Sequence, residues 1–259
     1  MSEINIVTVK WGKKYDNEYV NKLFRGVLRN TSKSIKFYCF TEDSSNIDES
    51  IKCLPLPTTK LEGIYENVHH NYCWLYKTAG LSKNNLADLE GKRVFFFDLD
   101  VIITGNLDSL FEYPLFQDFY IINDWNTNGD HVGQASFFSF VVGTLGYLTD
   151  DFEKNHEKIM KKYNTASQEY LSDMVIQKYG KLNFWPDELI RSFKYHCLPY
   201  WFLRTCIKPS IPHDSRIVVF HGNPDMEQAM EGVWEENMPI YKRIYKNFLP
   251  CKWIENYWF

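Results

Sequence analysis

Two carboxylate side chains stand two positions apart, directly after an apolar run. Asp98 and Asp100 follow residues 93–97, which are Arg-Val-Phe-Phe-Phe. In extended backbone, residues i and i+2 share a face, with Cα atoms about 6.5–7 Å apart, so both carboxylates can bind one divalent cation. The pattern alone is weak evidence, because a chain of this length contains about one by chance. Its position after the apolar run favours a metal site over a pair of solvated loop carboxylates.

A histidine follows a second apolar run. His221 comes directly after residues 217–220, and an imidazole at the end of a strand can be a metal ligand. Gly222, the next residue, allows the backbone to approach a ligand closely. Taken alone, His221 fits a structural histidine at a turn just as well. Two carboxylates and one imidazole together suit Mn²⁺ or Mg²⁺, with coordination positions left for phosphate oxygens.

The elements that must position these residues follow from hydrophobic periodicity. In the first part of the chain, strands are predicted at 4–9, 35–40, 51–54 and 93–97, and helices at 72–81 and after an N-cap at Asp16. This alternation predicts an α/β fold with a mostly parallel central sheet flanked by helices. Residues 93–97 are typical of a central strand buried on both faces, and ligands bind at the carboxyl ends of such strands.

The second half of the chain is less regular. Its predicted strands are 119–123, 137–142 and 216–220, and its predicted helices are 151–163 and 168–179. The uncharged stretch 132–149 is interpreted as a buried strand and loop, because it is short for a membrane span and contains polar residues. Since no internal repeat or linker is visible, we predict a single domain over 1–238, followed by a tail over 239–259.

The composition of the chain argues against some classes of function. The net charge of −4, from 29 Lys+Arg against 33 Asp+Glu, argues against a nucleic-acid-binding protein. The aromatic fraction is 17%, and aromatic rings build cores but also stack on flat ligands such as sugars and bases. The six cysteines form no Cys-x-x-Cys pair and the sequence opens without a signal peptide. We therefore expect reduced thiols and a cytoplasmic protein.

Seven segments in order along the chain carry a family resemblance. They are residues 9–15, 19–23, 96–101, 105–111, 185–188, 191–197 and 219–222. Together they resemble bacterial DxD glycosyltransferases of the GT-A fold, near glycosyltransferase family 8 and the lipooligosaccharide galactosyltransferases. The resemblance implies a Rossmann-like GT-A domain with a less regular acceptor side. It implies transfer of a sugar from a nucleotide sugar, most often a UDP-sugar, to a hydroxyl of a glycan or lipid-linked acceptor.

The same resemblance implies roles for particular residues. The metal ligands, for Mn²⁺ or Mg²⁺, would be Asp98, Asp100 and His221. The nucleotide-sugar-binding residues would be Val9, Lys10, Trp11, Lys77, Asp98, Gly222 and Asn223. Gln168 and Glu169 would stabilise the oxocarbenium-like transition state. Two of these have plain alternatives, since Lys77 could be a solvated helix lysine and Glu169 could serve only the N-terminus of a helix.

Two positions depart from the family pattern. Gln134-Ala135-Ser136-Phe137 stands where the family has Asn-Ser-Ser-Val, which leaves the sugar specificity open. Asp225 stands where the family has a lysine that meets the donor diphosphate. Either the Asp225 side chain points away, or its loop lies further from the donor. Lys77 or Lys10 would then supply the missing positive charge. We favour the second alternative with Lys77, because it lies in the helix before the metal-binding strand.

Other functions remain as alternatives. A haloacid-dehalogenase-type phosphohydrolase also places Asp-x-Asp after an apolar strand, but it requires Thr or Val where this chain has Ile102. A non-catalytic carbohydrate-binding protein would account for the aromatic residues, yet it needs no metal-ready carboxylates. An inverting glycosyltransferase would need a general base, for which the candidates are Asp124, Asp130, Asp173 and Asp187.

The C-terminal tail combines basic and aromatic side chains. Lys242, Arg243, Lys246 and Lys252 stand against a single acid, Glu255. Basic residues attract anionic lipid, and Trp and Tyr favour the interface between membrane and water. We therefore predict peripheral contact with the inner face of a membrane, which suits a lipid-linked acceptor. A helix docked on the body of the protein is the alternative.

Overall fold

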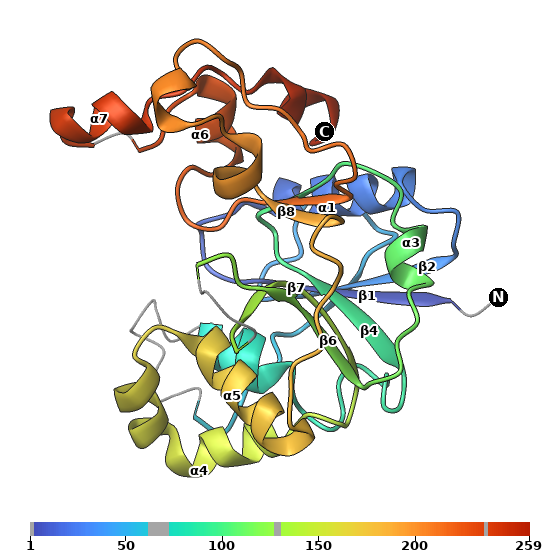
Figure 1. Ribbon diagram of the computed structural model, residues 1–259. Helices are drawn as coiled ribbons and strands as arrows, with labels where there is room; N and C mark the ends of the chain where they lie inside the picture. The colour runs from blue at the N-terminus through green and yellow to red at the C-terminus, as the bar shows by residue number, and fades with distance from the viewer. Residues whose placement is uncertain (1–2, 62–72, 127–130, 236–237) are drawn as a thin grey trace. The chain divides into compact units, whose positions relative to one another are not determined.

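The computed structural model describes residues 3–61, 73–126, 131–235 and 238–259 (Figure 1). The chain divides into two compact units. The first unit comprises Met1–Asn21, Lys33–Leu99 and Tyr113–Trp185, and the second comprises Lys22–Ser32, Asp100–Glu112 and Pro186–Phe259. The chain passes from the first unit to the second between Leu99 and Asp100, within the carboxylate pair.

The first unit contains a six-stranded sheet in the order β3-β2-β1-β4-β7-β6. The strands are β1 (Ile4–Lys10), β2 (Ile35–Thr41), β3 (Lys52–Leu54), β4 (Arg93–Phe97), β6 (Phe119–Asn123) and β7 (Gly133–Val141). Pairs β1–β2, β1–β4 and β2–β3 are parallel, whereas β7 is antiparallel to both β4 and β6. The predicted mostly parallel sheet flanked by helices is confirmed, with β7 as the reversed strand.

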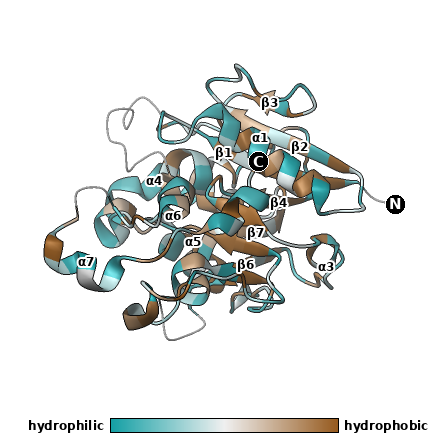
Figure 2. Cartoon of the chain, turned by 90° about the horizontal axis from the view of Figure 1, so that it is seen from above, coloured by the Kyte–Doolittle hydropathy of each residue, from teal (hydrophilic) through white to brown (hydrophobic). Residues whose placement is uncertain are grey.

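The centre of this sheet is made by β4. Val94, Phe95, Phe96 and Phe97 are each at most 3% exposed, so both faces of the strand are covered. Phe96 stacks on Phe138 of β7 with ring centroids 4.7 Å apart, and Figure 2 shows β4, β6 and β7 as mainly hydrophobic. Burial of apolar area at about 25 cal/mol per Å² fixes β4 firmly. The rigid strand in turn fixes the position of the residue that follows it.

Three helices pack together beside this sheet (Figure 1). They are the π-helix η1 (Cys73–Gly80), α4 (Gly146–Tyr163) and α5 (Ser167–Tyr179). Trp74 of η1, 1% exposed, stacks on Phe152 of α4 and contacts Tyr170 of α5 with a centroid distance of 5.6 Å. The predicted helix 72–81 is therefore present, although its first predicted residue lies outside the described residues. Helix α4 begins five residues earlier than the predicted segment 151–163.

The second unit contains a three-stranded sheet in the order β5-β9-β8. The strands are β5 (Val101–Ile103), β8 (Ile190–Ser192) and β9 (Ile217–Val219), with β5 antiparallel and β8 parallel to β9. Short helices follow: α3 (Asp108–Phe111), η2 (Phe193–Cys197), η3 (Trp201–Leu203), α6 (Met226–Glu231), α7 (Ile240–Lys246) and η4 (Lys252–Asn256). Helix α1 (Asn17–Arg29) begins in the first unit and continues into the second from Lys22.

The end of the chain packs within the second unit. Ile254 is fully buried and Trp258 is 5% exposed. The ammonium of Lys22 lies 3.6 Å from the ring centroid of Trp258, and Arg25 Nε donates to the carbonyl of Phe259 at 3.0 Å. Cys251, Ile254 and Trp258 thus belong to the core of this unit. Among the described residues, no helix has the length and hydropathy needed to span a bilayer.

Candidate functional site

Asp98 lies at the carboxyl end of β4 and is held from two sides. Its backbone N–H donates to the carbonyl of Ser136 at 2.8 Å. The hydroxyl of Thr8 on β1 donates to the carbonyl of Phe97 at 2.8 Å, which ties the two strand ends together. The carboxylate forms an ion pair with the ammonium of Lys77 on η1. Both side chains are mostly buried, with 12% of Lys77 and 20% of Asp98 exposed.

This pair settles the position of Lys77. The ammonium lies 5.3 Å from the ring centroid of Phe96 as well as against Asp98. Lys77 is therefore a partner of the first carboxylate and differs from a solvated helix lysine. A lysine that pairs with a carboxylate at a strand end is also placed to meet an anionic ligand there.

The start of β7 lies beside the end of β4 and connects it to α5. Gln134 and Ser136 are buried and bond to each other through Gln134 Nε2 and Ser136 Oγ at 2.8 Å. Gly133 N–H donates to Ser172 Oγ at 2.9 Å, and that hydroxyl donates to the carbonyl of Gln168 at 2.7 Å. The first turn of α5 is therefore attached to the strand that also holds Asp98.

Gln168 and Glu169 lie in this first turn. The N–H of Glu169 donates to the carbonyl of Ala166 at 3.0 Å, in the turn that opens the helix. A carboxylate at a helix N-terminus is favourable on electrostatic grounds, so the structural role of Glu169 and the proposed catalytic one coexist. The first unit thus places Lys77, Asp98 and the α5 N-terminus on connected elements.

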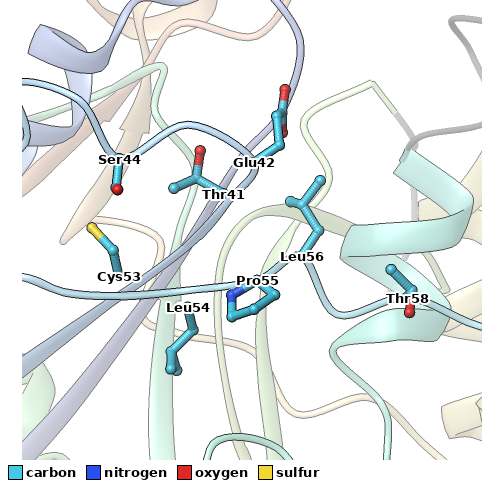
Figure 3. Close-up of a pocket in the computed structure, with 8 residues that line it drawn as sticks. All are labelled: Thr41, Glu42, Ser44, Cys53, Leu54, Pro55, Leu56 and Thr58. Carbon is cyan, nitrogen blue, oxygen red and sulfur yellow. The ribbon is translucent and has the colours of Figure 1, made fainter.

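Two open pockets lie where β1, β2 and β3 end. The first, of about 480 Å³, is bounded by the end of β2 and by the segment after β3. Figure 3 shows Thr41, Glu42 and Ser44 on one side and Cys53 to Thr58 on the other. The second, of about 590 Å³, includes Lys10, and the Glu42 carboxylate accepts from Gly12 N–H at 2.6 Å. Clefts at the carboxyl ends of α/β strands are the usual place for nucleotides.

The remaining residues of the predicted nucleotide side flank this edge. Val9 is 2% exposed and acts as core. Lys10 is 6% exposed, and its ammonium donates to the carbonyl of Gly12 at 3.2 Å. Trp11 lies 6.3 Å from Tyr76, the neighbour of Lys77, measured between ring centroids. Trp11 therefore lies between the end of β1 and η1.

In the second unit, Asp100 and His221 lie at adjoining ends of β5 and β9. Val101 pairs with Val219, and the N–H of Phe220 donates to the carbonyl of Asp100 at 2.9 Å. His221 Nε2 shares a hydrogen bond of 2.8 Å with Ser192 Oγ. Burial, with smaller contributions from Lys194 and His196, lowers the pKa of His221 to about 4. The imidazole is therefore neutral at neutral pH, the form that binds metals.

Lys194 of η2 lies beside the loop that follows β9. A Cβ added at Gly222, where φ is +69°, would lie 3.2 Å from Lys194 Nζ. Burial and the nearby Lys246 lower the pKa of Lys194, while Asp100 acts in the opposite direction. Asn223 follows on the same loop and is exposed. This lysine brings positive charge to the Asp100–His221 side of the chain.

Asp225 has a defined structural role. It is the N-cap of α6: its carboxylate accepts from Gln228 N–H at 2.9 Å, and Gln228 Oε1 accepts from Asp225 N–H at 3.0 Å. The side chain is thus directed to the helix, which is the first of the two alternatives stated above. The distance of this loop from the donor, and the role of Lys77 in replacing the missing charge, stay predictions.

The side chains of Asp98, Asp100 and His221 are of chemical types that bind divalent cations. Across the described ranges, no group of three or more Asp, Glu, His or Cys side chains is gathered as a metal site. Asp100 and the neutral His221 stand at adjoining strand ends, and Asp98 precedes Asp100 by two residues. Carboxylate oxygen and neutral imidazole nitrogen are suitable ligands for Mn²⁺, and carboxylate oxygen for Mg²⁺.

The candidate general bases differ in their surroundings. Asp124 accepts from Asn126 Nδ2 at 3.0 Å and is 6% exposed. Asp173 accepts from the hydroxyl of Tyr163 at 2.6 Å on the surface of α5. Asp130 lies outside the described residues.

Sequence reasoning missed three polar residues that the structure adds. Ser136 contacts Asp98, Ser192 bonds His221, and Lys194 lies beside Gly222. The last two belong to a segment quoted for the resemblance. A prediction that β8 pairs with β9 in parallel would have indicated Ser192 and Lys194, because both strands then end at the same edge of the sheet.

The fold resembles solved glycosyltransferase structures. The galactosyltransferase LgtC, in complex with donor and acceptor sugar analogs, matches with a TM-score of 0.59 and 12% identity over 86% of this chain and 89% of that chain. Mouse xyloside xylosyltransferase 1, in its apo form, matches with a TM-score of 0.53 and 11% identity over 85% and 98%. No protein-family model and no curated protein sequence matches the chain. The chain thus has the GT-A fold of these glycosyltransferases, and the predicted fold class is confirmed.

Proposed function

We propose that the chain is a metal-dependent glycosyltransferase that moves a sugar from a nucleotide sugar to an acceptor hydroxyl. The observation that carries the proposal is the Lys77–Asp98 pair at the carboxyl end of the central strand of a GT-A fold. The donor is a UDP-sugar, and the acceptor is a glycan or a lipid-linked glycan. We place the protein in the cytoplasm, with peripheral contact to the inner face of the membrane through residues 239–259.

Each residue of the candidate site has a stated task in this proposal. Asp98, Asp100 and His221 would hold Mn²⁺ or Mg²⁺, which supplies Lewis-acid charge neutralisation to the leaving nucleoside diphosphate. Lys77 binds a phosphate oxygen of the donor through a charge-assisted hydrogen bond. The residues that would bind the nucleotide are Val9, Lys10, Trp11, Gly222 and Asn223.

The reacting carbon of the donor sugar develops positive charge as the bond to the diphosphate breaks. Gln168 and Glu169 present an amide oxygen and a carboxylate, and oxygen dipoles directed at developing positive charge lower the barrier. Their attachment to β7 through Ser172 supports this role, because it keeps the α5 N-terminus next to the strand that holds Asp98. The acceptor hydroxyl then bonds to that carbon, and its proton leaves with the diphosphate or with a base.

The test is product formation with a panel of UDP-sugars, Mn²⁺ and glycan acceptors, followed by mass spectrometry. We expect UDP release to depend on the acceptor and on the metal. Asp100→Ala and His221→Ala should fold and lose transfer. Steady release of inorganic phosphate from phosphomonoesters without an acceptor would instead support the phosphohydrolase alternative. Full sugar transfer by either variant with the metal removed would contradict the proposed metal dependence.

A further inference from the structure

Three cations of the second unit surround a single aromatic ring. Lys246 Nζ, the Arg204 guanidinium and Lys194 Nζ lie 4.7, 5.7 and 6.0 Å from the ring centroid of Trp234. They come from three different helical segments, since Lys194 is on η2, Arg204 follows η3 and Lys246 ends α7. We name these four residues the Trp234 cluster.

Backbone contacts fix the geometry of the cluster. Arg204 Nη1 donates to the carbonyl of Tyr245 at 3.0 Å, and Leu249 N–H donates to the carbonyl of Arg204 at 3.0 Å. Trp234 packs edge-on against Phe248 at a centroid distance of 6.3 Å. These bonds join the end of η3 to the end of α7 and hold the Arg204 guanidinium beside Trp234.

The cluster has an excess of positive charge. Within the described part of the chain, no carboxylate forms an ion pair with any of the three cations. Asp100 attracts Lys194, and Lys246 repels that same lysine. Attraction to the face of a Trp ring offsets part of this repulsion, and a bound polyvalent anion would remove the rest.

Exposed aromatic side chains lie on the same two elements. Tyr200, Trp201 and Phe202, at η3, are 77%, 57% and 60% exposed. Tyr241 and Tyr245 of α7 are 64% and 41% exposed, and Figure 2 shows α7 with both hydrophobic and hydrophilic residues. Aromatic rings beside basic side chains are typical of surfaces that enter the interface of an anionic bilayer. Of residues 250–259, by contrast, Cys251, Ile254 and Trp258 are buried in the unit.

We propose that the Trp234 cluster binds the phosphate group of an anionic membrane lipid, while the exposed rings of η3 and α7 enter the bilayer interface. This deepens the peripheral membrane contact that belongs to the proposed function, on which it rests. It assigns the contact to α7, which lies within residues 239–259, and extends it to η3. Arg204 Nε and Nη1 already donate to the carbonyls of Pro199 and Tyr245. The phosphate therefore bonds to the ammonium groups of Lys194 and Lys246, which are compact charges with three donors each, and Arg204 adds its positive charge.

The test is co-sedimentation of the full chain with phosphatidylcholine vesicles that contain or lack phosphatidylglycerol. Lys246→Gln should weaken binding to the anionic vesicles about fivefold, from the attraction contributed by one lysine near a charged surface. Trp201→Ser combined with Phe202→Ser should weaken it as well, and both side chains are exposed enough for the fold to persist. Lys208→Gln removes an exposed charge outside the cluster and is the matched control. We expect it to bind like the unchanged protein.

Two results would overturn the proposal. One is equal binding of the unchanged chain and Lys246→Gln to anionic vesicles. The other is a loss of UDP affinity in Lys246→Gln, by calorimetry with Mn²⁺, while vesicle binding stays intact, because the cluster would then serve the nucleotide. Transfer to a soluble glycan is measured on the same preparations without vesicles. Lysine-dependent vesicle binding by a protein that transfers no sugar would refute the glycosyltransferase proposal and leave the lipid site standing.

Discussion

Two positively charged groups, the Lys77 ammonium and the proposed metal ion, bind the carboxylate of Asp98. In the structure it is paired with Lys77 in a mostly buried setting, and in the proposed function it is a metal ligand. Sequence spacing alone indicated the ligand role, because Asp98 and Asp100 follow a buried strand. It did not indicate that Lys77, twenty-one residues earlier, reaches the same carboxylate, since that depends on how η1 packs beside β4. Binding of a cation at Asp98 and release of Lys77 are therefore coupled.

A double-mutant cycle measures this pair. Lys77→Met and Asp98→Asn, alone and together, should give a coupling energy of about 1–3 kcal/mol in urea unfolding, because removal of one partner leaves the other poorly solvated. Lys60 and Glu153 provide the control, since Lys60 is 85% exposed and exposed pairs contribute about 0–1 kcal/mol. Equal coupling in the two cycles would show that the Lys77–Asp98 pair is not electrostatically special.

For Asp225 we predict an effect on stability and none on UDP binding. Asp225→Ala should lower the free energy of unfolding by about 1 kcal/mol through loss of the α6 cap, whereas Asp225→Asn should keep most of it. Asp225→Lys should show the same loss of stability and no gain in UDP affinity, because the position serves the helix. Tighter UDP binding by Asp225→Lys would mean that this residue faces the donor after all.

His221 predicts a dependence of stability on pH in the metal-free protein. Its pKa is about 4 in the folded chain against an ordinary value of 6.5, so between these values the unfolded chain binds a proton that the folded chain does not. The free energy of unfolding therefore falls as the pH falls from about 6.5 towards 4 and is fully retained above that window. We expect a loss of about 1–2 kcal/mol at about pH 5 relative to neutral pH, after allowance for solvent screening.

Urea unfolding with EDTA at several pH values checks this. His221→Gln should remove most of the dependence of the unfolding free energy on pH. A small dependence should remain, because burial also lowers the pKa of His196. His213→Gln, at a side chain that is 98% exposed, is the matched control and should leave the slope unchanged. A slope unaltered in His221→Gln would contradict the burial of a neutral imidazole.

At the scale of elements, most strands and the main helices were predictable, and strands β5 and β8 were not. β4 and β6 match their predicted bounds, and α5 starts one residue early. β5 and β8 have only three residues each, too few for a periodic signal, and they are defined by pairing with β9. The antiparallel direction of β7 could not be predicted either. The direction of a strand depends on which strands pair with it, and it does not change the pattern of apolar and polar residues along the strand.

The C-terminal element provides the prediction at this scale. Trp258→Ala should cost about 3 kcal/mol or more of unfolding free energy, because a nearly buried ring is replaced by a cavity and the contact with Lys22 is lost. Phe259→Ala should cost less than about 1 kcal/mol, since Phe259 is 52% exposed and surface changes are usually small. Chemical denaturation of both variants checks the difference. Equal costs would indicate that the end of the chain does not dock as described.

At the scale of the whole molecule, the resemblance predicted the fold, which is confirmed, and named the residues of the candidate site. It could not assign the partners of those residues, since Ser136, Ser192 and Lys194 act through contacts between elements distant in sequence. The substitution at Asp225 shows the limit most clearly. A motif position predicts where the backbone goes, while the side chain follows the local demands of the helix that begins there.

The central claim is metal-dependent binding of a nucleoside diphosphate, and thermal unfolding with UDP tests it most directly. A ligand at a hundredfold excess over its Kd stabilises the folded state by about 2.7 kcal/mol. With UDP and Mn²⁺ the melting temperature should therefore rise by about 5–10 °C. With UDP and EDTA, or in Asp100→Ala with both ligands present, it should stay within about a degree of the unliganded value. A rise of equal size in EDTA, or no rise with Mn²⁺ and any nucleoside diphosphate, would contradict the account.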